Sequence, residues 1–164
     1  MRILLIDDDA IGNFICRKIF EHLGFNGQLD ITTYARDAIQ LLEKLAATSR
    51  EQFPSLIMLD LNMPLMNGFE FLEYYQDRGW HQSFSQTGII MLSSSIFPKD
   101  ERRSRSFPAV VDYFTKPLSI EKIHKAIAYS CSDRLRRVWA SSPAAPVYHC
   151  AAKGPPNEPY PGQN

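Results

Sequence analysis

The sequence has few cysteines and no pattern that would join them. Its three cysteines, Cys16, Cys131 and Cys150, are widely spaced and include no CxxC pair, which argues against both a disulfide framework and a zinc site. The four histidines likewise show no metal-ligand spacing. A reducing compartment fits this cysteine usage best, so we expect a cytoplasmic protein.

Long apolar runs and an excess of either charge are also missing. The apolar run at residues 3–6 is too short for the core of a signal peptide and far below the roughly 18 apolar residues of a membrane span. Eighteen basic residues balance eighteen acidic ones, so the whole molecule has no general attraction for nucleic acid or an anionic membrane. Arg102, Arg103 and Arg105 have no interleaved aromatic residues, which favours a solvated helix face. We therefore expect neither nucleic acid nor a membrane as a partner.

What the sequence does contain is enough apolar mass for one globular domain, followed by a segment of different composition. The 164 residues, 45% of them hydrophobic, correspond to a single core. Six of the eleven prolines lie between Pro143 and Pro161, and no apolar period runs through that stretch. We predict a folded domain at residues 1–139 and a flexible, Pro-rich C-terminal tail at residues 140–164.

Short apolar runs alternate with stretches of helical period, which is typical of βα units around a parallel sheet. Strands are predicted at residues 2–6, 28–32, 56–59, 89–92 and 110–114. Five helices are predicted from apolar residues at helical spacing or from cap residues. The first three are marked by Ile11, Phe14, Ile15, Ile19 and Leu23 before Gly24, by Ala38, Leu41, Leu42 and Leu45, and by Phe69, Leu72 and Tyr75. The fourth is a short segment after Pro98, and the fifth follows the cap residue Ser119, carries Ile120, Ile123, Ala126, Ile127 and Ser130 along one face, and has a pattern that allows extension through Leu135. The fold class is therefore α/β, a doubly wound five-stranded parallel sheet with five helices.

Polar residues follow four of the predicted strands and should meet at one edge of the sheet, where open α/β folds bind ligands. They are Asp7-Asp8-Asp9, Asp60, Ser93-Ser94-Ser95 and Thr115-Lys116-Pro117. Each has an ordinary explanation when taken alone: Asp8 or Asp9 as a helix cap, Ser93 as a turn residue, Lys116 as a surface charge. Adjacent carboxylates, however, raise one another's pKa unless a positive charge lies between them, and such oxygen ligands suit Mg²⁺.

These residues give the chain a resemblance to the receiver domain of two-component response regulators, over roughly residues 1–130. The resemblance is carried by Ile6-Asp7-Asp8-Asp9, by Leu59-Asp60-Leu61-Asn62-Met63-Pro64 with Asn67-Gly68, by Leu92-Ser93-Ser94, and by Tyr113-Phe114-Thr115-Lys116-Pro117. Each motif alone is weak, whereas their order and spacing together are highly specific. The resemblance implies a flavodoxin-like fold. Because no output domain follows residue 139, it favours a stand-alone receiver that signals by binding an output protein.

The resemblance also implies the chemistry of the site. Asp60 would be the phosphoacceptor, attacking a phosphoryl group carried by a histidine kinase or phosphotransfer protein. Mg²⁺ would be bound by Asp8 directly, by Asp7 through water, by Asp60, and by the main-chain carbonyl of Asn62. Lys116 would neutralise charge on the phosphoryl oxygens.

Two further residues would report the modification. The Ser93 hydroxyl would bond to a phosphoryl oxygen, while the small Ser94 keeps access open. Tyr113 would be the switch aromatic, although an ordinary aromatic at a strand end is the alternative. The Lys116-Pro117 bond could be cis and so aim the lysine. The family implies a phosphoacceptor regulatory domain rather than an enzyme, with self-catalysed phosphorylation and dephosphorylation left open.

Two other functional classes compete with this interpretation. A phosphatase with an aspartyl nucleophile shares the fold class, but it normally needs a second carboxylate two residues after the nucleophile, where this chain has Asn62. A flavin-binding module is weaker still, since acidic strand ends would repel the cofactor phosphate. Departures from the family pattern fall in two connections, after the second helix through Arg50 and at residues 78–87. These departures concern loop geometry and leave the site residues unchanged.

Overall fold

The structure is a computed structural model and describes residues 1–94 and 97–130. Its elements in chain order are β1 (Arg2–Ile6), α1 (Ala10–His22), β2 (Gln28–Thr32), α2 (Ala35–Thr48), the short 3-10 helix η1 (Arg50–Gln52), β3 (Leu56–Asp60), α3 (Gly68–Asp77), α4 (Trp80–Ser83), β4 (Gly88–Ser93), α5 (Pro98–Ser104), β5 (Val110–Thr115) and α6 (Ile120–Ser130). All five predicted strands form. They make one parallel sheet in the order β2-β1-β3-β4-β5, which confirms the flavodoxin-like, doubly wound fold.

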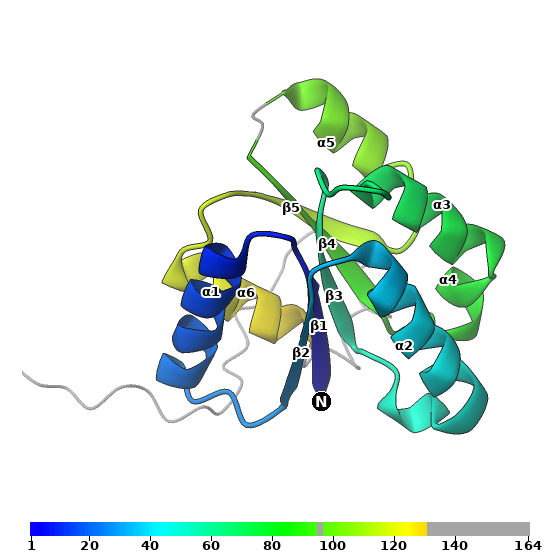
Figure 1. Cartoon of the computed structure of the whole chain (residues 1–164), viewed down its shortest axis with the longest axis horizontal. Helices are drawn as coiled ribbons and strands as arrows, with labels where there is room; N and C mark the ends of the chain where they lie inside the picture. Colours follow the sequence, from blue (N-terminus) through cyan, green and yellow to red (C-terminus); the bar gives the residue numbers. More distant parts are fainter. Residues whose placement is uncertain (95–96, 131–164) are drawn as a thin grey trace, which may run out of the picture.

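Helices cover both faces of the sheet, as a parallel sheet requires (Figure 1). α1 and α6 lie on one face, and α2, α3 and α4 lie on the other. Every residue of the central strands β3 and β4 is buried, because these strands have neighbours on both sides and helices on both faces. The apolar runs in the sequence arise because successive residues of a strand face opposite sides of the sheet and both sides are covered.

The first helix forms where it was predicted, but the apolar residues that mark it in the sequence are not all buried. Ile11, Phe14 and Ile15 are half exposed or more, whereas the buried side chains of α1 are Asn13, Cys16 and Phe20. Asn13 lies inside because its amide Nδ2 donates a hydrogen bond to the main-chain carbonyl of Asp7 at 2.7 Å. The apolar stripe of α1 is thus turned toward solvent at its N-terminal end.

The described residues contain six α-helices rather than the five that were predicted. The additional helix, α4, follows Gly79, which adopts φ +66 at its N-cap. It forms because Trp80 is buried edge-on against the ring of Phe53, while Phe84 stacks on the same ring with 3.6 Å between centroids. This aromatic cluster explains the length and composition of residues 78–87.

The remaining predictions concern the fourth predicted helix and the C-terminal part. The helix after Pro98 forms as α5, with Ser104 as its buried residue, and the cap at Ser119 is confirmed by a hydrogen bond from the Lys122 amide to Ser119 Oγ at 3.3 Å. The domain boundary at residue 139, the tail at residues 140–164 and the extension of the last helix lie outside the described residues. No helix among residues 1–94 and 97–130 is long and apolar enough to cross a membrane.

Candidate functional site

The carboxyl ends of four strands bring the predicted site residues to one edge of the sheet. Asp60, Ser93 and Thr115 are the last residues of β3, β4 and β5, and Asp7 directly follows β1. Asp7, Asp60 and Ser93 are all buried, with exposed fractions of 4%, 3% and 0%. Buried polar side chains at strand ends are costly unless they are paired, so their partners decide what this site can do.

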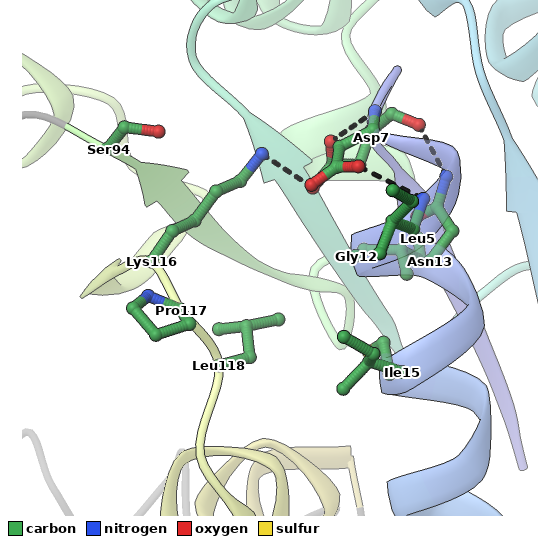
Figure 2. Close-up of a pocket in the computed structure, with 12 residues that line it drawn as sticks. Leu5, Asp7, Gly12, Asn13, Ile15, Ser94, Lys116, Pro117 and Leu118 are labelled. Carbon is green, nitrogen blue, oxygen red and sulfur yellow. Dashed lines mark hydrogen bonds and ion pairs between the residues drawn. The ribbon is translucent and has the colours of Figure 1, made fainter.

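Lys116 connects the two buried carboxylates. Its Nζ lies 2.6 Å from Asp7 Oδ2 and 3.2 Å from Asp60 Oδ1, and Figure 2 shows the side chain reaching across the site toward Asp7. The amide of Lys116 donates to the Ser93 carbonyl at 2.7 Å, which continues the β4–β5 pairing by one residue. The bond between Lys116 and Pro117 is cis, as anticipated.

The pKa values of this triad follow from burial and proximity. Burial raises the pKa of Asp60 above its ordinary value, and the Asp7 carboxylate adds to the rise, while Lys116 and a hydrogen bond from the Asn62 amide oppose it. Burial alone would lower the pKa of Lys116, but the Asp7 and Asp60 carboxylates raise it above its ordinary value. Lys116 is therefore charged at neutral pH. The Asp60 carboxylate is more basic than an ordinary aspartate, because Lys116 offsets only part of the effect of burial.

Three carboxylates form a group that could hold a cation. One oxygen from each of Asp7, Asp8 and Asp60 lies within 4.8 Å of the others, and Asp8 is the exposed member. Among the described residues, Lys116 is the one lysine paired with the two buried carboxylates, so this part of the chain keeps an excess of negative charge there. This donor set of hard oxygens with one open side fits Mg²⁺, which keeps several of its waters.

Asp9 and Asn62 occupy different positions from that group. Asp9 is the N-cap of α1, and its Oδ1 accepts a hydrogen bond from the Ile11 amide at 3.0 Å. The helix-cap interpretation is thus right for Asp9. Asn62 is exposed, and its main-chain amide donates to the Asp60 carboxylate. This amide is one of the groups that hold the Asp60 side chain in place.

Two residues on neighbouring helices support the site: Asn13, which the sequence did not single out, and Gly68, which belongs to one of the motifs that carry the family resemblance. Asn13, on α1, donates a hydrogen bond to the Asp7 carbonyl. The apolar pattern draws attention to its neighbours Ile11, Phe14 and Ile15, and the one signal for Asn13 in the sequence is an amide side chain among these apolar residues. Gly68, at the start of α3, donates its amide to the Leu61 carbonyl at 2.9 Å. A Cβ at Gly68 would lie 2.6 Å from the Asp60 carbonyl oxygen, so glycine permits the close approach of α3 to β3.

A cleft of about 360 Å³ opens beside the triad, between α1 and the segment after β5 (Figure 2). Asp7, Lys116 and Ser94 line its polar end, and Ile15 and Leu118 line its apolar end. Cys16 also lines it, but burial and the Asp7 charge raise the pKa of this thiol to about 12. Cys16 is therefore protonated at neutral pH and is no nucleophile.

Tyr113 lies on β5, two residues before Thr115, and packs against the core cluster on the α2 and α3 side of the sheet. Its hydroxyl is buried and has no hydrogen-bond partner within the part of the chain that the structure describes. A buried hydroxyl without a partner costs about 1–3 kcal/mol.

A five-stranded parallel sheet that ends in aspartates, a serine and a lysine defines a flavodoxin-like α/β protein with an acidic pocket at its carboxyl edge. The family model for the response regulator receiver domain matches residues 3–128. The chain therefore belongs to the receiver domain family of two-component response regulators. Domains of this family are generally regulatory rather than enzymatic, and they bind Mg²⁺ through an acidic pocket.

Individual relatives agree with this assignment. A probable methanogenesis regulatory protein of Methanothrix harundinacea is 26% identical over 137 residues, covering 84% of this chain and 82% of that protein. A two-component response regulator of Arabidopsis thaliana is 34% identical over 125 residues, covering 75% of this chain and 18% of that protein. The chain spans 16–18% of the length of the plant relatives it matches. The crystal structure of a two-component response regulator from Cytophaga hutchinsonii has a TM-score of 0.71 at 28% identity, covering 80% of this chain and 97% of that one.

Proposed function

We propose that this chain accepts a phosphoryl group on Asp60 from a histidine kinase or a phosphotransfer protein, and that the modified domain signals by binding an output protein. The observation that carries the proposal is the pairing of a buried, basic Asp60 carboxylate with a charged Lys116 at 3.2 Å, beside two further aspartates. Membership of the receiver family supports the phosphoacceptor role.

The reaction transfers a phosphoryl group from a histidine nitrogen to a carboxylate oxygen. An oxygen of the Asp60 carboxylate attacks the phosphorus of a phosphohistidine, an O–P bond forms, and the N–P bond breaks as the imidazole leaves. The product is an acyl phosphate, with no net consumption of another reagent. Lys116 faces the growing charge on the phosphoryl oxygens, and the Asn62 amide holds the carboxylate.

We assign Mg²⁺ to Asp7, Asp8 and Asp60, with the main-chain carbonyl of Asn62 as a further ligand. When bound, the ion would supply positive charge to the phosphoryl oxygens during transfer. The support for this assignment is the excess negative charge of the three carboxylates over the one lysine.

Transmission is assigned to Ser93 and Tyr113. The Ser93 hydroxyl, at the end of β4 next to β3, is the group we expect to bond to a phosphoryl oxygen on Asp60. Movement of β4 toward that oxygen would change the packing around Tyr113, whose register partner on β4 is Met91. Because its buried hydroxyl has no partner among residues 1–94 and 97–130, Tyr113 is a suitable two-state element.

The aspartyl phosphatase is not supported as the alternative. Asn62 offers no carboxyl group two residues after Asp60, so the general acid that such an enzyme needs is missing at that position.

The test is intact mass after incubation with a small acyl phosphate and Mg²⁺. The parent should gain one phosphoryl group, and Asp60→Asn should gain none, because a neutral amide is a far poorer nucleophile. Retention of the circular dichroism spectrum in Asp60→Asn is the control for folding. Full labelling of that variant at the parent's rate, mapped to another residue, would overturn the proposal.

A further inference from the structure

Lys122, on the first turn of α6, binds the segment that carries Lys116. Its ammonium donates to the Thr115 carbonyl, to the Thr115 hydroxyl at 3.1 Å, and to the Pro117 carbonyl at 3.3 Å. Three donors is the full complement of a lysine ammonium. All three are used on the two residues that flank Lys116.

These contacts restrict the backbone on both sides of Lys116. The Lys116 amide is already fixed to the Ser93 carbonyl at 2.7 Å, and the carbonyls before and after it both point to one ammonium. The direction in which the Lys116 side chain leaves the main chain is therefore set from two elements, β4 and α6. Hydrogen bonds from a charged donor are about twice as strong as neutral ones.

The position of Lys116 matters because its side chain is long and has many rotamers. Its Nζ must stay near Asp7 and Asp60, at 2.6 and 3.2 Å, to neutralise charge in the site. A misplacement of about 1 Å in a reacting group can cost a factor of about 100 in rate. A free segment at Thr115–Pro117 would leave that placement to the side chain alone.

We propose that Lys122 is a positioning residue for Lys116: by binding the oxygens on both sides of it, Lys122 holds the lysine of the phosphoryl site in place. The proposal rests on the function proposed above for Asp60 and Lys116. Lys122 touches no reacting atom in this arrangement, and it acts through the main chain.

The chain offers a matched control on the same helix. Lys125 also binds β5 through its ammonium, which lies 2.6 Å from Asp112 Oδ2, and its side chain is 56% exposed. Lys122→Met and Lys125→Met each remove one ammonium that joins α6 to β5. Only the first removes contacts to the residues beside Lys116.

The experiment measures two quantities on the full chain of each variant. The first is the rate of phosphorylation by a small acyl phosphate with Mg²⁺. The second is the acylation rate of the Lys116 amine by acetic anhydride, followed by mass spectrometry of its peptide; in the parent, this side chain is only 18% exposed. Melting temperatures identify variants that are merely destabilised.

We expect Lys122→Met to phosphorylate about tenfold more slowly and to acylate about tenfold faster at Lys116, since one charge-assisted hydrogen bond accounts for a change of that size. Lys125→Met should match the parent in both rates, and Lys122→Arg, which keeps charge and donors, should recover most of the loss. Parent-like values of both rates in Lys122→Met would overturn the proposal, as would an equal change in Lys125→Met.

Two other outcomes are also decisive. If Lys122→Met does not fold, Lys122→Gln, which keeps an amide donor without the charge, takes its place, and parent-like values in that variant overturn the proposal. If the parent takes up no phosphoryl group, the proposed function fails, and protection of Lys116 from acylation then decides alone whether Lys122 positions it.

Discussion

Gly68→Ala tests how closely the site depends on the contact between α3 and β3. A Cβ at this position would lie 2.6 Å from the Asp60 carbonyl oxygen and 3.0 Å from both Leu61 Cα and Met91 Cε. The first two of these are main-chain atoms that cannot move away without shifting the strand that ends in Asp60. Alanine should therefore displace Asp60, the proposed nucleophile.

The magnitude comes from two opposing effects. Overpacking by one methyl group typically costs about 1–3 kcal/mol, whereas replacing a helical glycine with alanine stabilises by about 0.5–1 kcal/mol. We expect a net loss of about 1–2 kcal/mol, which corresponds to a fall in melting temperature of roughly 3–8 °C for a domain of this size.

The matched control is Gly12→Ala in α1. A Cβ there would also meet an atom closely, Asp9 Oδ2 at 2.7 Å, but that atom is the end of an exposed side chain. The Asp9 carboxylate can turn away, but this weakens its hydrogen bond to the Ile11 amide, so the gain in helix propensity and the loss of capping oppose each other. Gly12→Ala should therefore lie within about 1 kcal/mol of the parent in stability.

Thermal melting and the phosphorylation rate measure both variants. Gly68→Ala should melt lower and accept the phosphoryl group more slowly, whereas Gly12→Ala should accept it at the parent's rate. The reasoning is refuted if Gly68→Ala melts at or above the parent's temperature and is phosphorylated at the parent's rate.

Mg²⁺ should stabilise the parent by about 2.7 kcal/mol at a hundredfold excess over Kd; a melting curve of Asp8→Ala that rises as much would contradict the assigned ligands. Lys116→Ala should retain part of its labelling at Asp60, because the nucleophile remains, but NMR should no longer detect a response of Tyr113 to phosphorylation; an undiminished response would be inconsistent with that role. Tyr113→Phe should raise the stability of the unmodified protein by about 1 kcal/mol, since it removes a buried hydroxyl without a partner among the described residues, and calorimetry showing a loss would argue against it. Deletion of residues 141–164 should leave melting and labelling unchanged, as a proline-rich segment without an apolar period should bury little surface; a large drop in melting temperature would place the domain boundary elsewhere.

The strands and the site could be predicted from sequence because both depend on local patterns. A parallel strand with helices on both faces is a continuous apolar run. The residues after such runs meet at the carboxyl edge of the sheet, independently of the conformation of the connecting loops. That is why Asp7, Asp60, Ser93 and Lys116 could be expected together before any geometry was known.

The inner face of α1 could not be predicted from the same kind of pattern. A count of apolar positions favours Ile11, Phe14 and Ile15, yet the helix turns Asn13 inward because the Asp7 carbonyl needs a donor there. One buried hydrogen bond to the end of β1 thus fixes the rotation of the helix. The signal lies in the tertiary partner and not in the periodicity.

α4 was missed for a related reason. Four residues are too few to show a helical period, and the helix is held by the packing of Trp80 and Phe84 on Phe53, which is distant in sequence. The contacts of Lys122 belong to the same class. They depend on how the chain turns between β5 and α6, which the residue types alone do not specify.

On the function proposed for Asp60, the electrostatics of the site give a reason for holding Lys116 in place. Lys116 lies closer to Asp7 than to Asp60, at 2.6 against 3.2 Å, so Asp60, the proposed nucleophile, is the less neutralised of the two buried carboxylates. Burial raises its pKa accordingly, and a more basic oxygen is a better nucleophile as long as it stays ionised. Once Asp60 carries a phosphoryl group, the negative charge lies on the phosphoryl oxygens, and the Lys116 ammonium has to neutralise it there. A lysine whose main chain is fixed by β4 and α6 can make that shift by rotating its side chain alone, and this is the part that the proposal gives to the contacts of Lys122, which touches no reacting atom.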